Sequence, residues 1–288
     1  MMRFLLGLAL LLPLSVQAFY QAQYDEGSLE IRGLVETLGL AANNPNDELL
    51  YPDDKILGAA LSGRLMLDID WPHWQFEAHA VQGYQSDELQ LSGRGYRSIR
   101  DVERSDVFTT RFASDDATLL LDRFNLQYGK GPLNLKIGRQ PVNLASTFYF
   151  TPNDFFAPFA AQTFYRTYKP GVDAARVDWQ WSALSQLTLL AVLDYHADAN
   201  TDTGWKKSPD WGNTAFLARA STLVGNNQWG LLAAEIDNDQ IIGFDLQGEV
   251  FGWLGIRAEG HMRFFDEADR ERDSKLSLSF EYRPSSRS

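Results

Sequence analysis

Charged side chains occupy every second position in several segments of the chain. In the segment around Glu259, for example, Arg257, Glu259 and Arg263 alternate with apolar residues. Seven of the eight bases at such positions are arginine, which pairs with a carboxylate through two parallel hydrogen bonds. Strand faces that carry both charges can line a water-filled space that conducts charged solutes. Alternatively, their opposite charges can pair across a narrow space and close it. The residues expected to line this space are Arg64, Asp68, Glu77, Arg123, Lys136, Arg176, Asp178, Asp245, Glu249, Arg257, Glu259 and Arg263.

The elements that must position these charges are β-strands. Successive side chains of a strand point to opposite faces, so this alternation gives each segment one polar and one apolar face. The segments run about 10 to 12 residues, close to the length of a tilted strand that crosses a membrane and longer than the five or six residues usual in soluble sheets. The pattern predicts twelve strands, over residues 28–40, 56–70, 73–85, 117–128, 132–143, 170–181, 185–196, 214–224, 228–237, 240–251, 254–265 and 275–283.

The connections between these strands alternate in length. Every second connection is a tight turn, as at Trp71-Pro72 and Gly252-Trp253, while most of the others are long and polar; residues 238–239 are a short exception. Six of the eight tryptophans lie at or beside the tight turns, where amphipathic rings would meet a membrane interface. We therefore expect an all-β, antiparallel transmembrane β-barrel of about twelve strands with short periplasmic turns and long extracellular loops. Its register over 214–237 stays open.

The first 18 residues have the three parts of a secretory signal. A basic residue, Arg3, precedes an apolar stretch that is too short to span a bilayer, and Val16-Gln17-Ala18 fits a cleavage site. We expect a cleaved signal peptide over 1–18 and a single barrel domain over 19–288. The expected location is the outer membrane of a Gram-negative bacterium.

Two charged residues do not fit the predicted strand faces. Asp122 shares parity with the apolar Phe124, and Arg139 shares parity with Leu135 and Ile137. A charge that faces lipid costs about 2–4 kcal/mol at the membrane midplane. A β-bulge or a position near the rim would remove either conflict.

The segment 144–169 is unusually aromatic for a loop, with nine Phe or Tyr residues. Such a loop is costly to leave in water, so we expect it to pack into the barrel mouth or onto another protein. The residues expected to form a constriction are Tyr149, Asp154, Phe155, Phe156 and Arg166.

Three short motifs resemble porin-like outer-membrane barrels of Gram-negative bacteria. They are Gly138-Arg139-Gln140 at a strand end, Thr151-Pro152-Asn153-Asp154-Phe155-Phe156 in the aromatic loop, and Tyr168-Lys169-Pro170-Gly171-Val172-Asp173 at the start of the next strand. In porins, the loop between the fifth and sixth strands folds inward and narrows the pore. The resemblance therefore implies a channel for passive diffusion of small solutes or ions. Family porins often have sixteen or eighteen strands, so twelve does not fit a sixteen-stranded trimer.

Two other functions stay open. An outer-membrane enzyme that acts on lipid is disfavoured, because the His-x-Ser pair of twelve-stranded outer-membrane phospholipases has no counterpart at any of the four histidines. A sealed structural or partner-binding barrel could use its acidic loops, which include Asp47, Glu48, Asp266 and Glu267, although their spacing matches no calcium loop.

The composition narrows the partners further. With 26 Lys and Arg against 38 Asp and Glu, the chain has a net charge of −12, which disfavours nucleic-acid binding. Cysteine is absent, so no disulfide or cysteine metal site can form. We expect no cofactor and no metal. The expected partners are outer-membrane lipids, lipopolysaccharide and small solutes, and a homo-oligomer stays open.

Overall fold

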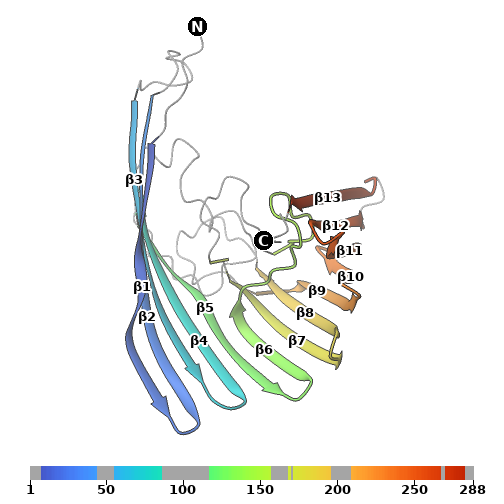
Figure 1. The fold of residues 1–288 in the computed structure, drawn as a ribbon, viewed down its shortest axis with the longest axis horizontal. Helices are drawn as coiled ribbons and strands as arrows, with labels where there is room; N and C mark the ends of the chain where they lie inside the picture. Colours follow the sequence, from blue (N-terminus) through green and yellow to red (C-terminus); the bar gives the residue numbers. More distant parts are fainter. Residues whose placement is uncertain are drawn as a thin grey trace. The chain divides into compact units, whose positions relative to one another are not determined.

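The fold is seen in a computed structural model, which describes residues 8–43, 55–85, 117–156, 168–169, 171–195, 209–266 and 270–282. The described residues form one antiparallel sheet in which each strand pairs with the next along the chain (Figure 1). No helix in these ranges is long and apolar enough to cross a membrane. The strands are β1 (Leu8–Tyr24), β2 (Gly27–Asn43), β3 (Lys55–Asp70), β4 (Trp74–Gln85), β5 (Ala117–Lys130), β6 (Leu133–Gln140), β7 (Val172–Ser182), β8 (Ser185–Tyr195), β9 (Pro209–Val224), β10 (Asn227–Ile236), β11 (Asp239–Val250), β12 (Leu254–Phe264) and β13 (Asp273–Tyr282).

The sheet has one strand more than predicted. Strands β2 to β13 correspond to the twelve predicted strands, and β1 is additional. It begins inside the predicted signal peptide and continues through Phe19–Tyr24, where Tyr20, Ala22 and Tyr24 alternate with glutamines. The twelve predicted strands do not include this segment, because its alternation is short and precedes the two-residue connection to β2. In the described residues, β1 and β13 are the two edges of the sheet, which is not closed.

Positive backbone φ angles mark several of the tight turns. Asp237 and Asn238, which join β10 to β11, have φ of 56° and 65°. Two successive positive angles are the signature of a type I′ hairpin, whose twist matches that of the flanking strands. The short connection predicted at residues 238–239 therefore lies one residue earlier in the structure, at 237–238. Gly225 and Gly252 reach φ of 61° and 73° at two other turns, where glycine has no steric cost.

The chain divides into two compact units. Unit 1 comprises residues 1–101, 108–124 and 198–206, and unit 2 comprises 102–107, 125–197 and 207–288. Unit 1 therefore contains β1 to β4 and the start of β5. Unit 2 contains the rest of β5 together with β6 to β13.

The strands of unit 2 have one exposed apolar face. Leu231 on β10, Ile242 on β11 and Leu276 on β13 are 58% to 69% exposed. Their neighbours in sequence, such as Leu232 and Ile241, are almost completely buried on the other face. The predicted alternation therefore separates two different environments in the structure.

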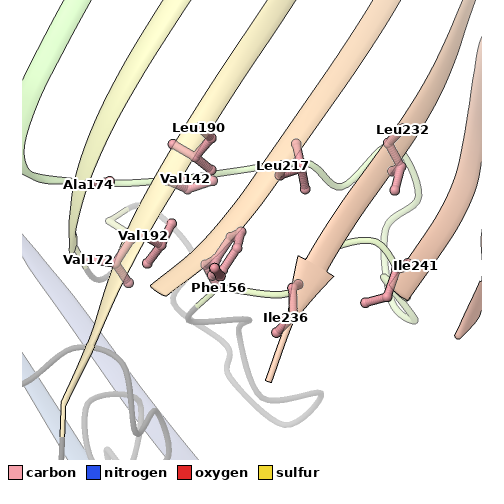
Figure 2. Close-up of a cluster of buried hydrophobic side chains, with 11 residues drawn as sticks. Val142, Phe156, Val172, Ala174, Leu190, Val192, Leu217, Leu232, Ile236 and Ile241 are labelled. Carbon is pink, nitrogen blue, oxygen red and sulfur yellow. The ribbon is translucent and has the colours of Figure 1, made fainter. Parts of the chain in front are cut away.

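The buried face carries an apolar cluster in unit 2. Side chains from β7 to β11 contribute to it, and two residues outside the sheet, Val142 and Phe156, complete it (Figure 2). Phe156 is only 1% exposed. Since both residues come from the segment that follows β6, this segment is packed onto the face that also carries the charged side chains. The strand members are Val172, Ala174, Leu190, Val192, Ala215, Leu217, Leu232, Ile236 and Ile241.

Both residues that did not fit the predicted faces are buried. In unit 1, Asp122 and the adjacent Arg123 are both buried, so the alternation slips by one residue there, as a bulge would cause. In unit 2, Gly138 has φ of 111° and precedes Arg139, which is 1% exposed. Only glycine adopts this backbone conformation without steric cost. The alternation is interrupted there, so Arg139 is buried although Ile137, two residues earlier, is exposed.

Candidate functional site

A buried carboxylate on β12 anchors the segment from Pro141 to Phe156 on the polar face of unit 2. Glu259 on β12 is fully buried, and its side chain accepts hydrogen bonds from three backbone N–H groups of this segment. The donors are Ser146, Thr147 at 3.0 Å and Asn153 at 3.2 Å. The three amide donors supply the hydrogen-bond partners that a buried carboxylate needs in place of water. Glu259 is one of the residues expected to line a pore, which stays a prediction; the contacts in the structure show that it anchors the loop.

Asn153 adds a second attachment beside Glu259. This side chain is fully buried; its Nδ2 donates to the Phe244 carbonyl of β11 at 2.8 Å, and its Oδ1 lies 3.2 Å from Nδ1 of His261 on β12. The ring of Phe155 packs against His261, with 5.1 Å between the ring centres. The motif Thr151–Phe156 thus supplies contacts to two neighbouring strands.

Arg257 is the third contact between β12 and this segment. Its Nη1 donates to the Ser146 carbonyl at 3.2 Å and to Oε1 of Gln247 at 3.4 Å. The guanidinium carbon lies 4.3 Å from the centre of the Phe148 ring, within the range of a cation–π interaction. Glu259 and Arg257 therefore hold the same turn of the segment from two positions on one strand.

A buried ion pair joins the two described ends of the aromatic loop. Lys169 Nζ donates to Asp154 Oδ1, and both residues are 7% exposed. Burial raises the pKa of Asp154 and lowers the pKa of Lys169, because each charge has lost its hydration; the partner acts in the opposite direction in both cases. Each residue thus depends on the other to remain charged.

Arginine–aspartate pairs cover much of the remaining polar face of unit 2. Arg139 pairs with Asp173, Arg176 with Asp178, Arg219 with Asp245, and Arg263 with Asp239. In all four pairs the arginine uses Nε and Nη2, at N–O distances from 2.5 to 3.1 Å. Gly230 lies close to one of them, because a Cβ added there would be 2.2 Å from Asp245 Oδ1.

Unit 1 has its own polar network. Asp68 accepts hydrogen bonds from Arg32 at 2.5 Å and lies 2.9 Å from His79 Nε2. Arg64 and Arg123 both donate to Asp122, at 2.5 and 2.9 Å. These contacts pair opposite charges side by side within this part of the sheet.

The other predicted site residues range from exposed to buried. Glu77 lies directly across from Asp68 in the β3–β4 register and is half-buried, as are Lys136 and Glu249. Tyr149 is 83% exposed, whereas Phe155 and Phe156 pack inward. Arg166 lies outside the described residues.

Several residues of the site were not identified from the sequence. The roles of Asn153, Lys169 and His261 depend on partners 15 to 108 positions away, which alternation along a strand does not reveal. The motif Thr151–Phe156 was the available signal, because its polar residues interrupt an aromatic run. Within the ranges that the structure covers, no group of three or more acidic or histidine side chains is arranged to hold a metal ion.

Comparison with known proteins gives no matching family model and no curated protein with significant similarity.

Proposed function

We propose that the mature chain, residues 19–288, closes into an outer-membrane barrel and acts as a porin-like channel for small solutes or ions. The observation that carries this proposal is the attachment of the segment Pro141–Phe156 to the polar face through Glu259. In a closed barrel, a segment folded over the inward-facing polar side would narrow the lumen. The proposal includes location in the outer membrane of a Gram-negative bacterium.

The two faces of the sheet support this function. Large apolar side chains such as Ile242 remain exposed on one face, which lipid would cover. The opposite face carries paired charges, which suit a hydrated lumen better than a dry core. An open sheet edge cannot remain unpaired in lipid, so membrane insertion requires closure.

The tryptophans near the tight turns provide independent support. Six of them are exposed by 43% to 51% beside the connections that join β3 to β4, β7 to β8, β9 to β10 and β11 to β12. Exposed indole rings at one end of the strands suit the headgroup level of a bilayer. They are Trp71, Trp74, Trp179, Trp181, Trp229 and Trp253.

The test is single-channel recording from the refolded mature protein in a planar lipid bilayer. We expect stepwise conductance. Glu259→Ala removes the acceptor of three amide hydrogen bonds and should release the segment, so conductance should increase or fluctuate more strongly. Shortening residues 150–165 should also increase it. Ser279→Ala, which changes a half-buried residue of the same face on β13, is the matched control and should leave conductance unchanged.

Absence of conductance in all these variants, from protein shown to be folded and inserted, would refute the channel. The charge pairs would then favour a sealed structural or partner-binding barrel. The same preparation should also be assayed for lipid hydrolysis, which would support the enzymatic alternative.

A further inference from the structure

Arg257 differs from the other arginines of the described strands in having no carboxylate partner. Each of the others forms an ion pair with an aspartate or glutamate. The protein partners of Arg257 within the described residues are all neutral: the Ser146 carbonyl, the Gln247 side chain and the Phe148 ring. The arginines with partners are Arg32, Arg64, Arg123, Arg139, Arg176, Arg219 and Arg263.

The two guanidinium nitrogens of Arg257 that bind no described residue, Nε and Nη2, are the atoms with which other arginines of this protein bind carboxylates. In four arginine–aspartate pairs of unit 2, the aspartate contacts Nε and Nη2. In Arg257, only Nη1 donates to protein atoms in the part of the chain that the structure describes. The contact with the Phe148 ring is not a hydrogen bond and therefore takes up neither Nε nor Nη2, the two donors that bind carboxylates in the other pairs.

Among the residues that the structure describes, no acidic side chain forms an ion pair with Arg257. Glu259, two residues along β12, is fully buried and bound to three amides of the loop. Glu249 lies on β11, where it pairs in register with Gly255 rather than with Arg257. The residue directly opposite Arg257 on β11 is the neutral Gln247.

The loop beside Arg257 presents exposed aromatic side chains. Phe148, Tyr149 and Phe150 are 44%, 83% and 54% exposed. Phe148 is the ring on which Arg257 stacks, so a cation and an apolar surface adjoin at one place. An anion with an apolar body would gain from both.

We propose that Arg257 and the aromatic run Phe148–Phe150 form a binding site for small carboxylates with an aromatic or apolar body. The carboxylate takes the position at Nε and Nη2 that an aspartate takes in the other pairs. The ring or alkyl body contacts the exposed aromatic side chains. This inference rests on the proposed channel for its physiological meaning, because the site would then select among the solutes that pass.

The test measures binding separately from conduction. Radiolabelled benzoate is equilibrated by dialysis with the full mature protein folded in detergent micelles, and uptake by protein-free micelles is subtracted. Arg257→Gln should weaken binding at least about tenfold, the loss expected for charge-assisted hydrogen bonds. Arg257→Lys should also weaken it, because an ammonium group keeps the charge but lacks the planar pair of donors.

Arg270→Gln is the matched control. Arg270 also stacks on a phenylalanine, at 4.0 Å from the Phe265 ring, but it lies outside this site. Benzoate binding should be unchanged in this variant, and benzylamine, which has the same ring and the opposite charge, should not bind the wild-type protein. Circular dichroism verifies that each variant is folded.

The outcomes separate the two proposals. Benzoate binding that is unchanged in Arg257→Gln would overturn the site, whether or not the protein conducts. Unchanged binding in Arg257→Lys would overturn the role of the two in-plane donors. Binding that depends on Arg257, in a protein that conducts no current, would retain the site and refute the channel.

Discussion

The buried pair of Asp154 and Lys169 gives the most direct test of how the aromatic loop is held. Lys169→Met removes one partner and leaves Asp154, which is 7% exposed, as an unpaired buried charge. Loss of one partner of a buried ion pair costs about 3–5 kcal/mol, mainly because the remaining charge is neither hydrated nor paired. We expect a decrease of this size in the free energy of unfolding at neutral pH.

The double variant Asp154→Asn/Lys169→Met distinguishes this explanation from simple loss of contacts. With both charges removed, no unpaired ion remains, so stability should return to within about 1 kcal/mol of the wild type. The measurement is urea unfolding of the protein reconstituted in lipid vesicles, followed by the fluorescence of its eight tryptophans. If the double variant is as unstable as the sum of the two single variants, the reasoning is wrong.

The same pair predicts opposite pH dependences for the two single variants. Burial raises the pKa of Asp154 above its ordinary 3.8, so the folded state takes up a proton more readily than the unfolded chain. In Lys169→Met, stability relative to the wild type should therefore increase as the pH falls from neutral toward 3.8. Burial lowers the pKa of Lys169 below its ordinary 10.5, so Asp154→Asn should instead gain relative stability as the pH rises toward 10.5.

Two further predictions concern the two faces of the sheet. Gly230→Ala would place a Cβ 2.2 Å from Asp245 Oδ1 and should decrease the free energy of unfolding, measured in urea, by about 1–3 kcal/mol. Gly63→Ala, with open space around its Cβ, should have little effect. Equal stability of the two variants would contradict the packing described at Gly230. Ile242→Arg adds a charge to the exposed apolar face and should decrease the free energy of unfolding in vesicles by about 2–4 kcal/mol at a membrane midplane position. Ile242→Leu should fold normally, and normal folding of the arginine variant would argue against lipid contact at this residue.

Much of the sheet could be predicted because the side-chain period of a strand is local information. On β11 and β13, Ile242 and Leu276 were assigned to the apolar face from alternation alone, and both are exposed opposite buried neighbours. The failures occurred where a local irregularity shifts the period. The positive φ of Gly138 precedes Arg139, and the slip at Asp122 turns two consecutive residues inward.

The site was less predictable because its partners are distant in sequence. Alternation correctly grouped Glu259 with the polar residues of β12, but it could not distinguish a pore-lining residue from one that binds three amides of a loop. The pairing of Lys169 with Asp154 and of Asn153 with His261 likewise depends on how the loop folds back. A pattern of period two contains no information on such contacts.

The position of Glu259 also has a consequence for the order of folding. The loop that it anchors follows β6, yet Glu259 lies on β12, 106 to 113 residues later in the chain. Contacts of such large sequence separation form late, because the entropy of closing the intervening chain must be overcome first. An assembly intermediate that lacks β12 therefore has no acceptor for the amides of Ser146, Thr147 and Asn153. The loop reaches its final place only when the sheet is nearly complete, so its docking reports that assembly has reached its last strands.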